Sequence, residues 1–209
     1  MERSLFTSAA VLAGGQSRRM GFDKSQLHIG GRPLLDSILE QLETRFDRIV
    51  IVADREKDLV ERTDVEVMYD LVPGIGPLAG LYTALKHFRE GFVFLTACDM
   101  PVVDVGFIDR MKEEYRSRES NMCDAILGKH IGTGMIEPFH AFYSCGLVPE
   151  IEHLLEAGEG GEPRRRSFRS LLHDRETLFV DMEEAGFSLN LNRQADVDTF
   201  IKSNQEREE

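Results

Sequence analysis

The residue types that could do chemistry gather first in the loop VLAGGQSRRMGFDK, which runs from Val11 to Lys24. Glycine backbone amides can approach an anion closely, and Arg and Lys side chains pair well with phosphate. The loop has neither the GxxxxGK[ST] nor the GxGxxG spacing of two common nucleotide-binding loops. We expect a phosphate-binding loop that uses Gly14, Gly15, Arg19 and Lys24. A structural turn that carries solvated cations is the alternative.

Two aspartates follow predicted strands further along the chain. Asp99 ends the apolar run FVFLTACD, where a lone carboxylate is costly unless it is paired or bound to a metal. Proteins often hold Mg²⁺ with one or two carboxylates together with substrate phosphates. Capping of the next helix is the alternative for Asp99, although Asp104 is an equally good cap. Asp70 could accept a hydrogen bond from a ribose or base, or could start the turn before Pro73.

The net charge of the chain limits the kinds of partner that it can bind. The chain carries a net charge of −12, which argues against non-specific binding of nucleic acid. Cations nevertheless gather a second time beside the Gly-rich stretch EAGEGGEP: Arg164, Arg165, Arg166 and Arg169. This cluster could bind an anionic substrate. The alternative, which the sequence supports equally, is that these arginines lie on a solvated surface loop. His140, in EPFHAFY, is expected to be a core histidine with a satisfied hydrogen bond.

The elements that must position these residues alternate between strands and helices. Apolar strands are predicted at Ser8 to Leu12, Arg48 to Ala53, Glu66 to Tyr69 and in FVFLTACDMP, with helical periodicity after Pro33 and Pro77. A further helix is expected around Arg55 to Arg62. The alternation predicts an α/β fold, with a mostly parallel sheet and helices on both faces. Ligands of such sheets bind beyond the carboxyl ends of the strands. The glycine-rich loop, the loop that starts at Asp70 and the loop that starts at Asp99 each follow a predicted strand, so they would converge at that edge.

The second half of the chain is less regular. Strands are predicted at Cys123 to Leu127, at Phe139 to Tyr143 and in FSLNLN, with helices at Val148 to Glu156 and in QADVDTFIKS. The charged tail NQEREE is expected to be frayed.

Length and composition suit one domain spanning residues 1–209. There is no apolar run of the roughly 20 residues that a transmembrane helix needs, and the N-terminus is typical of a strand rather than a secretory signal. Three cysteines without CxxC spacing indicate neither a disulfide framework nor a zinc site. We therefore expect a cytoplasmic protein with no membrane partner.

The loop LAGGQSRRMGFDK resembles LAGGxSxRMGxDK, the signature of the molybdenum cofactor guanylyltransferases (the MobA family). DLVPGIGPLAGL, LTACDMP, EPFHAFY and FSLNLN resemble later segments of that family, so the likeness spans about Ala9 to Val197. It implies a Rossmann-like nucleotidyltransferase fold. It also implies that GMP is transferred from GTP to molybdenum-bearing molybdopterin, with Mg²⁺. Pyrophosphate would be released and the molybdopterin guanine dinucleotide cofactor would form.

The resemblance also implies roles for single residues. The backbone of Leu12, Ala13 and Gly14 would contact the nucleotide, Lys24 would bind its phosphates, Asp70 would contact the nucleoside, and Asp99 would coordinate Mg²⁺. Asn190 and Asn192 match asparagines near the molybdopterin. Lys24, Arg19 and Asp99 would be the catalytic residues.

The expected mechanism divides the chain into a nucleotide-binding half, about residues 1–103, and a molybdopterin-side half, about 104–203. Lys24 and Arg19 would offset the charge that builds toward the leaving pyrophosphate. The nucleophile would be the anionic phosphate of molybdopterin, so that no general base is required. Arg166 and its neighbours could recruit molybdopterin or the acidic surface of its carrier.

Three other functions stay open at this point. A molybdopterin cytidylyltransferase would use CTP; those enzymes more often read LAAG with Pro before the Lys, so Gly14 and Asp23 favour GTP. Another small-phosphate nucleotidyltransferase of the same fold is the second. A non-catalytic nucleotide-binding regulator is the third, and it would be expected to lack the lysine or the metal aspartate. Proteins that deliver molybdopterin or receive the finished cofactor are further expected partners.

Overall fold

The computed structural model describes residues 5–13, 28–29, 31–53, 65–118, 122–157, 166–183, 191 and 194–208. In chain order its elements are β1 (Ser8–Leu12), β2 (His28–Ile29), β3 (Arg32–Pro33), α1 (Leu34–Glu43), β4 (Arg48–Ala53), β5 (Glu66–Tyr69), α2 (Pro77–Phe88), β6 (Phe92–Ala97), α3 (Val105–Arg116), β7 (Ala125–His130), β8 (Ile136–Ser144), the 3₁₀ helix η2 (Cys145–Leu147), α4 (Val148–Ala157), α5 (Phe168–Leu171), β9 (Thr177–Met182) and α6 (Gln194–Glu208).

The central sheet confirms the predicted fold class. Its seven strands lie in the order β5-β4-β1-β6-β8-β7-β9, and β2 and β3 form a separate two-stranded ribbon. β1 pairs in parallel with both β4 and β6, β4 with β5, and β7 with β9. Only β8 runs against its neighbours in this sheet. The carboxyl ends of β1, β4, β5 and β6 therefore meet at one edge.

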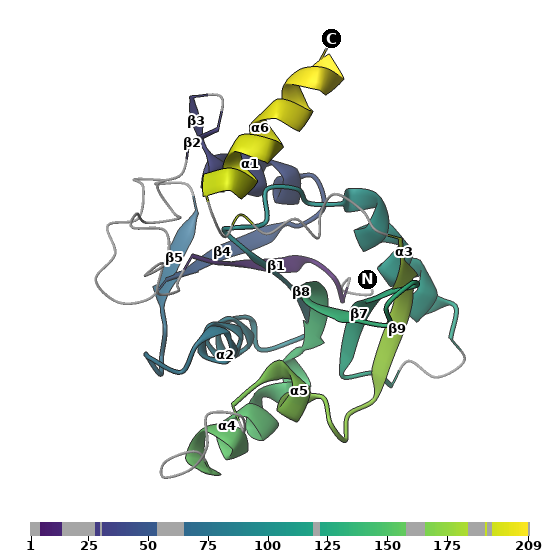
Figure 1. Ribbon diagram of the computed structural model, residues 1–209. Helices are drawn as coiled ribbons and strands as arrows, with labels where there is room; N and C mark the ends of the chain where they lie inside the picture. Colours follow the sequence, from purple (N-terminus) through teal and green to yellow (C-terminus); the bar gives the residue numbers. More distant parts are fainter. Residues whose placement is uncertain are drawn as a thin grey trace.

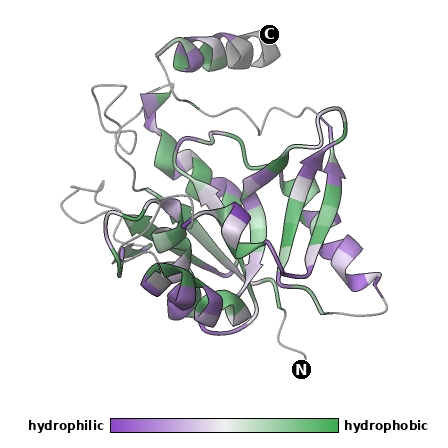
Figure 2. Cartoon of the chain, turned by 60° about the horizontal axis from the view of Figure 1, so that its bottom comes forward, coloured by the Kyte–Doolittle hydropathy of each residue, from purple (hydrophilic) through white to green (hydrophobic). Residues whose placement is uncertain are grey.

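Helices cover both faces of the sheet. One core cluster joins the sheet to α1, α3 and α6, and the other joins it to α2, α4 and α5. Figure 1 shows α1 and α6 above the sheet and α2, α4 and α5 below it. Hydrophobic residues follow the central strands in Figure 2, as expected for a sheet that is covered on both faces. β1 is buried along its whole length.

The two helices that flank β1 follow from their sequences. In α1 the apolar residues repeat at helical spacing and are all buried: Leu34, Leu35, Ile38, Leu39 and Leu42. α2 starts at Pro77, which lacks the N–H that the first turn cannot use. Gly76 precedes it at φ 87° and ψ −162°, a conformation that essentially only glycine adopts. The GIGP sequence thus sets where α2 begins.

Several elements differ from the sequence-based prediction. β6 ends at Ala97, so Asp99 lies in the following turn rather than at the strand end. β7 and β8 are longer than expected, and β9 and the β2–β3 ribbon were missed. Helix α6 continues to Glu208, beyond the end of the helix expected from the sequence. The expected helix at 55–62, and the expected strand FSLNLN apart from Leu191, lie outside the described residues.

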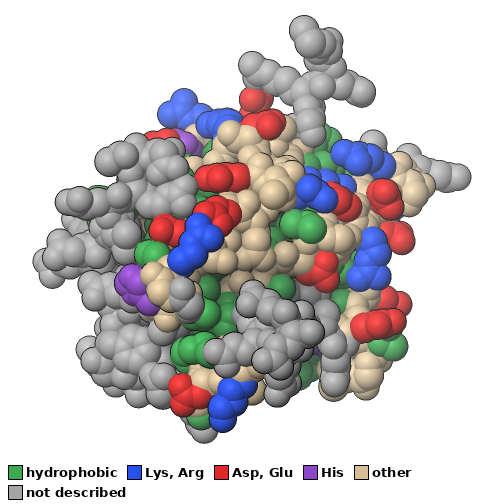
Figure 3. Space-filling model, turned by 90° about the horizontal axis from the view of Figure 1, so that it is seen from above, with side chains coloured by type: hydrophobic (Ala, Val, Ile, Leu, Met, Phe, Trp, Pro, Cys, Tyr) green, Lys and Arg blue, Asp and Glu red, His purple; other side chains and the backbone are tan. Residues whose placement is uncertain are grey.

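Acidic and basic side chains of the described residues are mixed on the surface. On the face seen in Figure 3, acidic and basic groups are interspersed. Some join helices: Glu152 of α4 accepts from Tyr82 (2.8 Å) and pairs with Lys86 (3.1 Å), both on α2. No helix within the described ranges is both long and apolar enough to cross a membrane.

The contact between Gly80 and Leu12 gives a stability prediction. A Cβ added at Gly80 would lie 2.7 Å from Cδ2 of Leu12, which is buried. Gly80→Ala gains about 1 kcal/mol of helix propensity and loses about 1–3 kcal/mol to overpacking, so we expect a net destabilisation of about 1 kcal/mol. Urea unfolding would measure it.

A double-mutant cycle is the control. If the clash is the cause, Gly80→Ala should cost about 1 kcal/mol less when Leu12 is also changed to Ala. Gly132→Ala, where a Cβ meets nothing within 4 Å, should leave stability nearly unchanged. Additive effects of Gly80→Ala and Leu12→Ala would contradict the packing explanation.

Candidate active site

Backbone hydrogen bonds join the ends of four strands, β1, β4, β5 and β6, at the carboxyl edge of the sheet. The N–H of Ala13 donates to the carbonyl of Val52 (2.8 Å), and the N–H of Cys98 donates to the carbonyl of Leu12 (3.0 Å). The N–H of Asp70 donates to the carbonyl of Ala53 (3.0 Å). The residues that follow β1, β5 and β6 therefore start from fixed positions at one edge. This is the convergence that the strand pattern predicted.

The amino-terminal turn of α2 lies at the same edge. Because Gly80 has no side chain, this turn packs directly against Leu12 at the end of β1. The loop before α2 is anchored by Thr83, whose Oγ1 accepts from the N–H of Leu71 (3.0 Å) and donates to the carbonyl of Ala79 (2.9 Å). The positive end of a helix dipole is thus directed toward the edge where an anionic ligand is expected.

Asp99 lies in the turn that follows β6. The turn closes through the N–H of Met100, which donates to the carbonyl of Ala97 (3.0 Å). The N–H of Leu191 donates to the carbonyl of Asp99 (2.8 Å). Leu191, from a distant part of the chain, is thus tied to the backbone of the predicted metal ligand.

Asp104, rather than Asp99, caps the following helix. Its carboxylate accepts from the N–H of Phe107 (2.9 Å) at the start of α3. The helix cap was the competing explanation for Asp99, and at α3 that role belongs to Asp104.

A second carboxylate near Asp99, that of Glu137, was missed by the sequence reasoning. Burial raises the pKa of the Glu137 carboxyl, and the nearby charge of Asp99 raises it further, while an N–H bond from Phe139 (3.0 Å) and His130 oppose the rise. The direction of β8 is what brings Glu137 to this place. Because β8 runs antiparallel to β6, the start of EPFHAFY lies at the end of the strand that precedes Asp99.

His140 is fully buried and is hydrogen bonded, as predicted. The N–H of Asp104 donates to its Nε2 (3.1 Å), which assigns the remaining ring proton to Nδ1. The ring packs edge-on against Phe94, with centroids 5.0 Å apart. Burial lowers the pKa of His140 to about 4, against the opposing effects of Asp104, so the imidazole is neutral at physiological pH.

The remaining predicted residues divide into two groups. Gly14, Gly15, Arg19, Lys24, Asn190 and Asn192 lie outside the described residues. Arg166 is described, and its Nη2 donates to the carbonyl of Leu155 (3.0 Å) in the last turn of α4. Arg169, on α5, is exposed. Their roles toward a substrate stay predictions.

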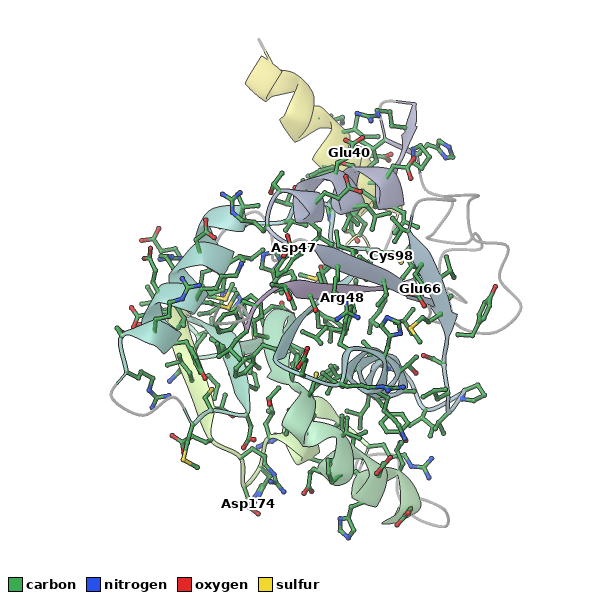
Figure 4. All side chains as sticks on the ribbon, turned by 180° about the vertical axis from the view of Figure 1, so that it is seen from behind. Glu40, Asp47, Arg48, Glu66, Cys98 and Asp174 are labelled. Atoms are coloured by element: carbon green, nitrogen blue, oxygen red, sulfur yellow. The ribbon has the colours of Figure 1, made fainter. Side chains whose placement is uncertain are left out.

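A cavity of about 320 Å³ opens at the opposite edge, where β4 and β5 begin. Figure 4 labels three of its lining residues, Asp47, Arg48 and Glu66. It is remote in the fold from the strand ends that carry Asp70 and Asp99, because parallel strands separate their amino and carboxyl ends. The cavity is therefore not part of the candidate site.

Comparison with known proteins places this chain among relatives of known family. A family described as the MobA-like NTP transferase domain matches residues 9–176. A molybdenum cofactor guanylyltransferase from Syntrophotalea carbinolica is 36% identical over 93% of this chain and 90% of that protein. A probable molybdenum cofactor guanylyltransferase from Peptoclostridium acidaminophilum is 35% identical over 88% and 80%.

A solved structure gives the same result. Molybdopterin-guanine dinucleotide biosynthesis protein A from Archaeoglobus fulgidus superposes with a TM-score of 0.78 at 28% identity, covering 95% of this chain and 99% of that one.

Buried His140 gives a pH prediction. Because its pKa falls from 6.5 to about 4 on folding, the unfolded chain takes up a proton first as the pH drops. The contribution of neutral His140 to the free energy of unfolding is intact above about pH 6.5. It is lost as the pH falls toward 4, by about 3 kcal/mol in total. His140→Gln lacks this titration. The stability gap between the two proteins, measured by urea unfolding, should therefore narrow between pH 7 and pH 4, and a constant gap would contradict the buried neutral state.

Proposed function

Because this chain belongs to the family of MobA-like NTP transferase domains, we propose that it transfers GMP from GTP to molybdenum-bearing molybdopterin, releasing pyrophosphate. The product would be the molybdopterin guanine dinucleotide cofactor. The chain is a nucleotidyltransferase by family, and the choice of GTP and molybdopterin is supported by the names of its relatives.

One observation carries the proposal beyond family membership. The N–H of Leu191 donates to the carbonyl of Asp99, in the turn that contains the predicted metal ligand. In the sequence, Leu191 stands between the two asparagines predicted for the molybdopterin side. An enzyme that joins two phosphorylated substrates needs both half-sites at one place, because the reaction depends on in-line placement. We assign residues 1–103 to the nucleotide and about 104–203 to molybdopterin.

The carboxyl edge has donors that fit Mg²⁺. Asp99 would hold the ion, and the neighbouring Glu137 carboxylate adds a second hard oxygen donor. Within the part of the chain that the structure describes, no three His, Cys, Asp or Glu side chains are grouped as a metal site. Substrate phosphates and water would supply the remaining ligands, as is usual for Mg²⁺. When bound, the ion would supply positive charge that stabilises the negative charge of the reacting phosphates.

The chain's own residues would position the reactants. A phosphate oxygen of molybdopterin forms a bond to the α-phosphorus of GTP. The bond from that phosphorus to the bridging oxygen breaks, and pyrophosphate leaves with the electron pair. The backbone of Leu12, Ala13, Gly14 and Gly15 would cradle the nucleotide. Lys24 and Arg19 would offset the charge of the leaving group.

Three further assignments complete the proposal. Asp70 would accept from the nucleoside at the end of β5. Asn190, Asn192 and Arg166 would face molybdopterin. The cytoplasm is the proposed compartment, since all three cysteines are free thiols. Proteins that deliver molybdopterin or receive the cofactor would be its partners.

Nucleotide choice is the first prediction. The loop LAGGQSRRMGFDK is of the guanine type, and Gly14 leaves room for close backbone approach. We expect GTP with Mg²⁺ to bind at least about tenfold more tightly than CTP or ATP, which corresponds to about 1.4 kcal/mol. Isothermal titration calorimetry with the three nucleotides would measure it. Equal or tighter binding of CTP would favour the cytidylyltransferase alternative.

The metal ligand is the second prediction. Asp99→Asn keeps the shape of the side chain and removes its charge, so turnover should fall by about 10² or more while the fold is retained. Pyrophosphate release from GTP in the presence of molybdopterin gives the rate, and circular dichroism checks the fold. Asp109→Asn, an exposed aspartate on α3, is the matched control. Near-normal activity of Asp99→Asn with an unchanged Mg²⁺ requirement would place the metal elsewhere.

A further inference from the structure

The loop that carries Asp99 is buried and must satisfy its backbone without water. Residues 98–104 connect β6 to α3, and Met100 and Val103 within it are 0% and 5% exposed. Buried N–H and C=O groups are costly when they have no partner. Three side-chain contacts to this loop come from distant elements, two from α1 and one from β8.

Gln41 of α1 supplies the first two contacts. Its Nε2 donates to the carbonyl of Pro101 (3.3 Å), and its Oε1 accepts from the N–H of Val103 (3.0 Å). The same Nε2 also donates to the carbonyl of Ser37 one turn earlier in α1 (2.9 Å), which orients the amide. One side chain thus bridges the loop on both sides of Val102.

His140 of β8 supplies the third contact, where its Nε2 accepts from the N–H of Asp104. Asp104 in turn caps α3 through Phe107, so the contact fixes the end of the loop to the start of the helix. The ring is held by Phe94 on β6, the strand that leads into the same loop. The imidazole therefore spans from the strand before the loop to the helix after it.

The backbone at His140 is in an unusual conformation. Its φ is 63°, one of two positive φ values among the described non-glycine residues. Such a conformation is strained for a residue other than glycine and persists only where the surroundings impose it. The register pairing of β8 with β6 covers Ala141 to Ser144, and its first pair, Ala141 opposite Leu95, comes directly after His140 in the chain. β8 therefore joins the ladder with β6 directly after the residue whose side chain contacts the loop.

We propose that Gln41 and His140 are positioning residues that hold the loop from Asp99 to Asp104 in the arrangement needed for Asp99 to bind a divalent metal–nucleotide complex. The inference rests on the proposed function in one respect, the assignment of Asp99 as the metal ligand. Neither residue touches the substrate; each acts through the loop backbone.

Direct binding of a Mn²⁺–nucleotide complex tests the proposal. The affinity for a non-hydrolysable GTP analogue is measured by calorimetry with Mn²⁺ and again in EDTA, and the electron paramagnetic resonance spectrum reports the bound Mn²⁺. Gln41→Met removes the amide at similar length, and His140→Phe removes both ring nitrogens. Each should weaken binding of the Mn²⁺ complex by about tenfold and leave metal-free binding unchanged.

Two variants control for a purely structural effect. His140→Gln keeps an acceptor at similar reach and should restore Mn²⁺-dependent affinity to within about twofold of the wild type. Phe142→Leu loosens the same aromatic cluster, in which its ring lies 5.2 Å from that of Phe94. Because a phenyl ring offers the loop no hydrogen-bonding nitrogen or oxygen, this variant should not change the Mn²⁺-dependent affinity. If Phe142→Leu lowers it as much as His140→Phe does, the effect belongs to the core and the proposal is overturned. Gln41 is only half-buried, so Gln41→Met provides a test even if His140→Phe does not fold.

The outcomes separate this inference from the proposed function. If Asp99→Asn loses Mn²⁺-dependent binding but Gln41→Met and His140→Phe do not, the positioning role is wrong and the metal site stands. If all three weaken Mn²⁺ binding while the wild type transfers no GMP to molybdopterin, the positioning role stands and the substrate assignment fails. Equal Mn²⁺ binding by Asp99→Asn and the wild type would overturn the metal assignment, and the positioning role with it.

Discussion

The pairing of β1 with β4 on one side and β6 on the other is the constraint on which the candidate site depends. β1 is only five residues long, yet all five are buried and all five are in register with both neighbours. Its last carbonyl accepts from Cys98, and the next N–H donates to Val52. The end of β1 is therefore held from both sides, and Ala13, at the start of the glycine-rich loop, leaves the sheet beside the turn that carries Asp99.

Close packing of α2 on β1 depends on a missing side chain. Gly80 allows the first turn of α2 to meet Leu12, and Gly76 allows the chain to turn into the helix at a φ that other residues rarely adopt. The glycines around the GPLAG segment thus allow close packing and a tight turn, and they supply no reactive side chain. A nucleotide at this edge would meet the backbone of β1 and the amino end of α2 together.

β8 has the opposite direction to its neighbours, and this reversal brings the second half of the chain to the site. An antiparallel strand starts where the parallel strands end, so Glu137 lies near Asp99 and His140 lies under the following loop. Burial acts differently on the two: it raises the pKa of the carboxyl and lowers that of the imidazole, and in both cases it disfavours charge. A bound cation would reverse the penalty for the carboxylates alone.

By itself the sequence determined four strands of the main sheet and the two helices that start near Pro33 and Pro77, because these elements have strong periodicity, β-branched runs and Pro or Gly at their ends. It did not give the short β2–β3 ribbon. The predicted strands at Ser8–Leu12, Arg48–Ala53 and Glu66–Tyr69 have the observed bounds. The buried face of α1 and the Asp104 cap were also readable, since both depend on neighbours within a few residues.

Only the tertiary structure decided what depends on partners distant in the sequence. β9 is an edge strand whose pairing with β7 was not visible in its short, mixed sequence, and α6 extends through a polar tail that periodicity alone did not predict. The roles of Glu137, His140 and Gln41 near the Asp99 turn arise from the direction of β8 and the packing of α1. Local propensity can be read from a single sequence, because it depends on neighbouring residues. Which distant backbone groups meet is decided only when the strands pair in the folded sheet.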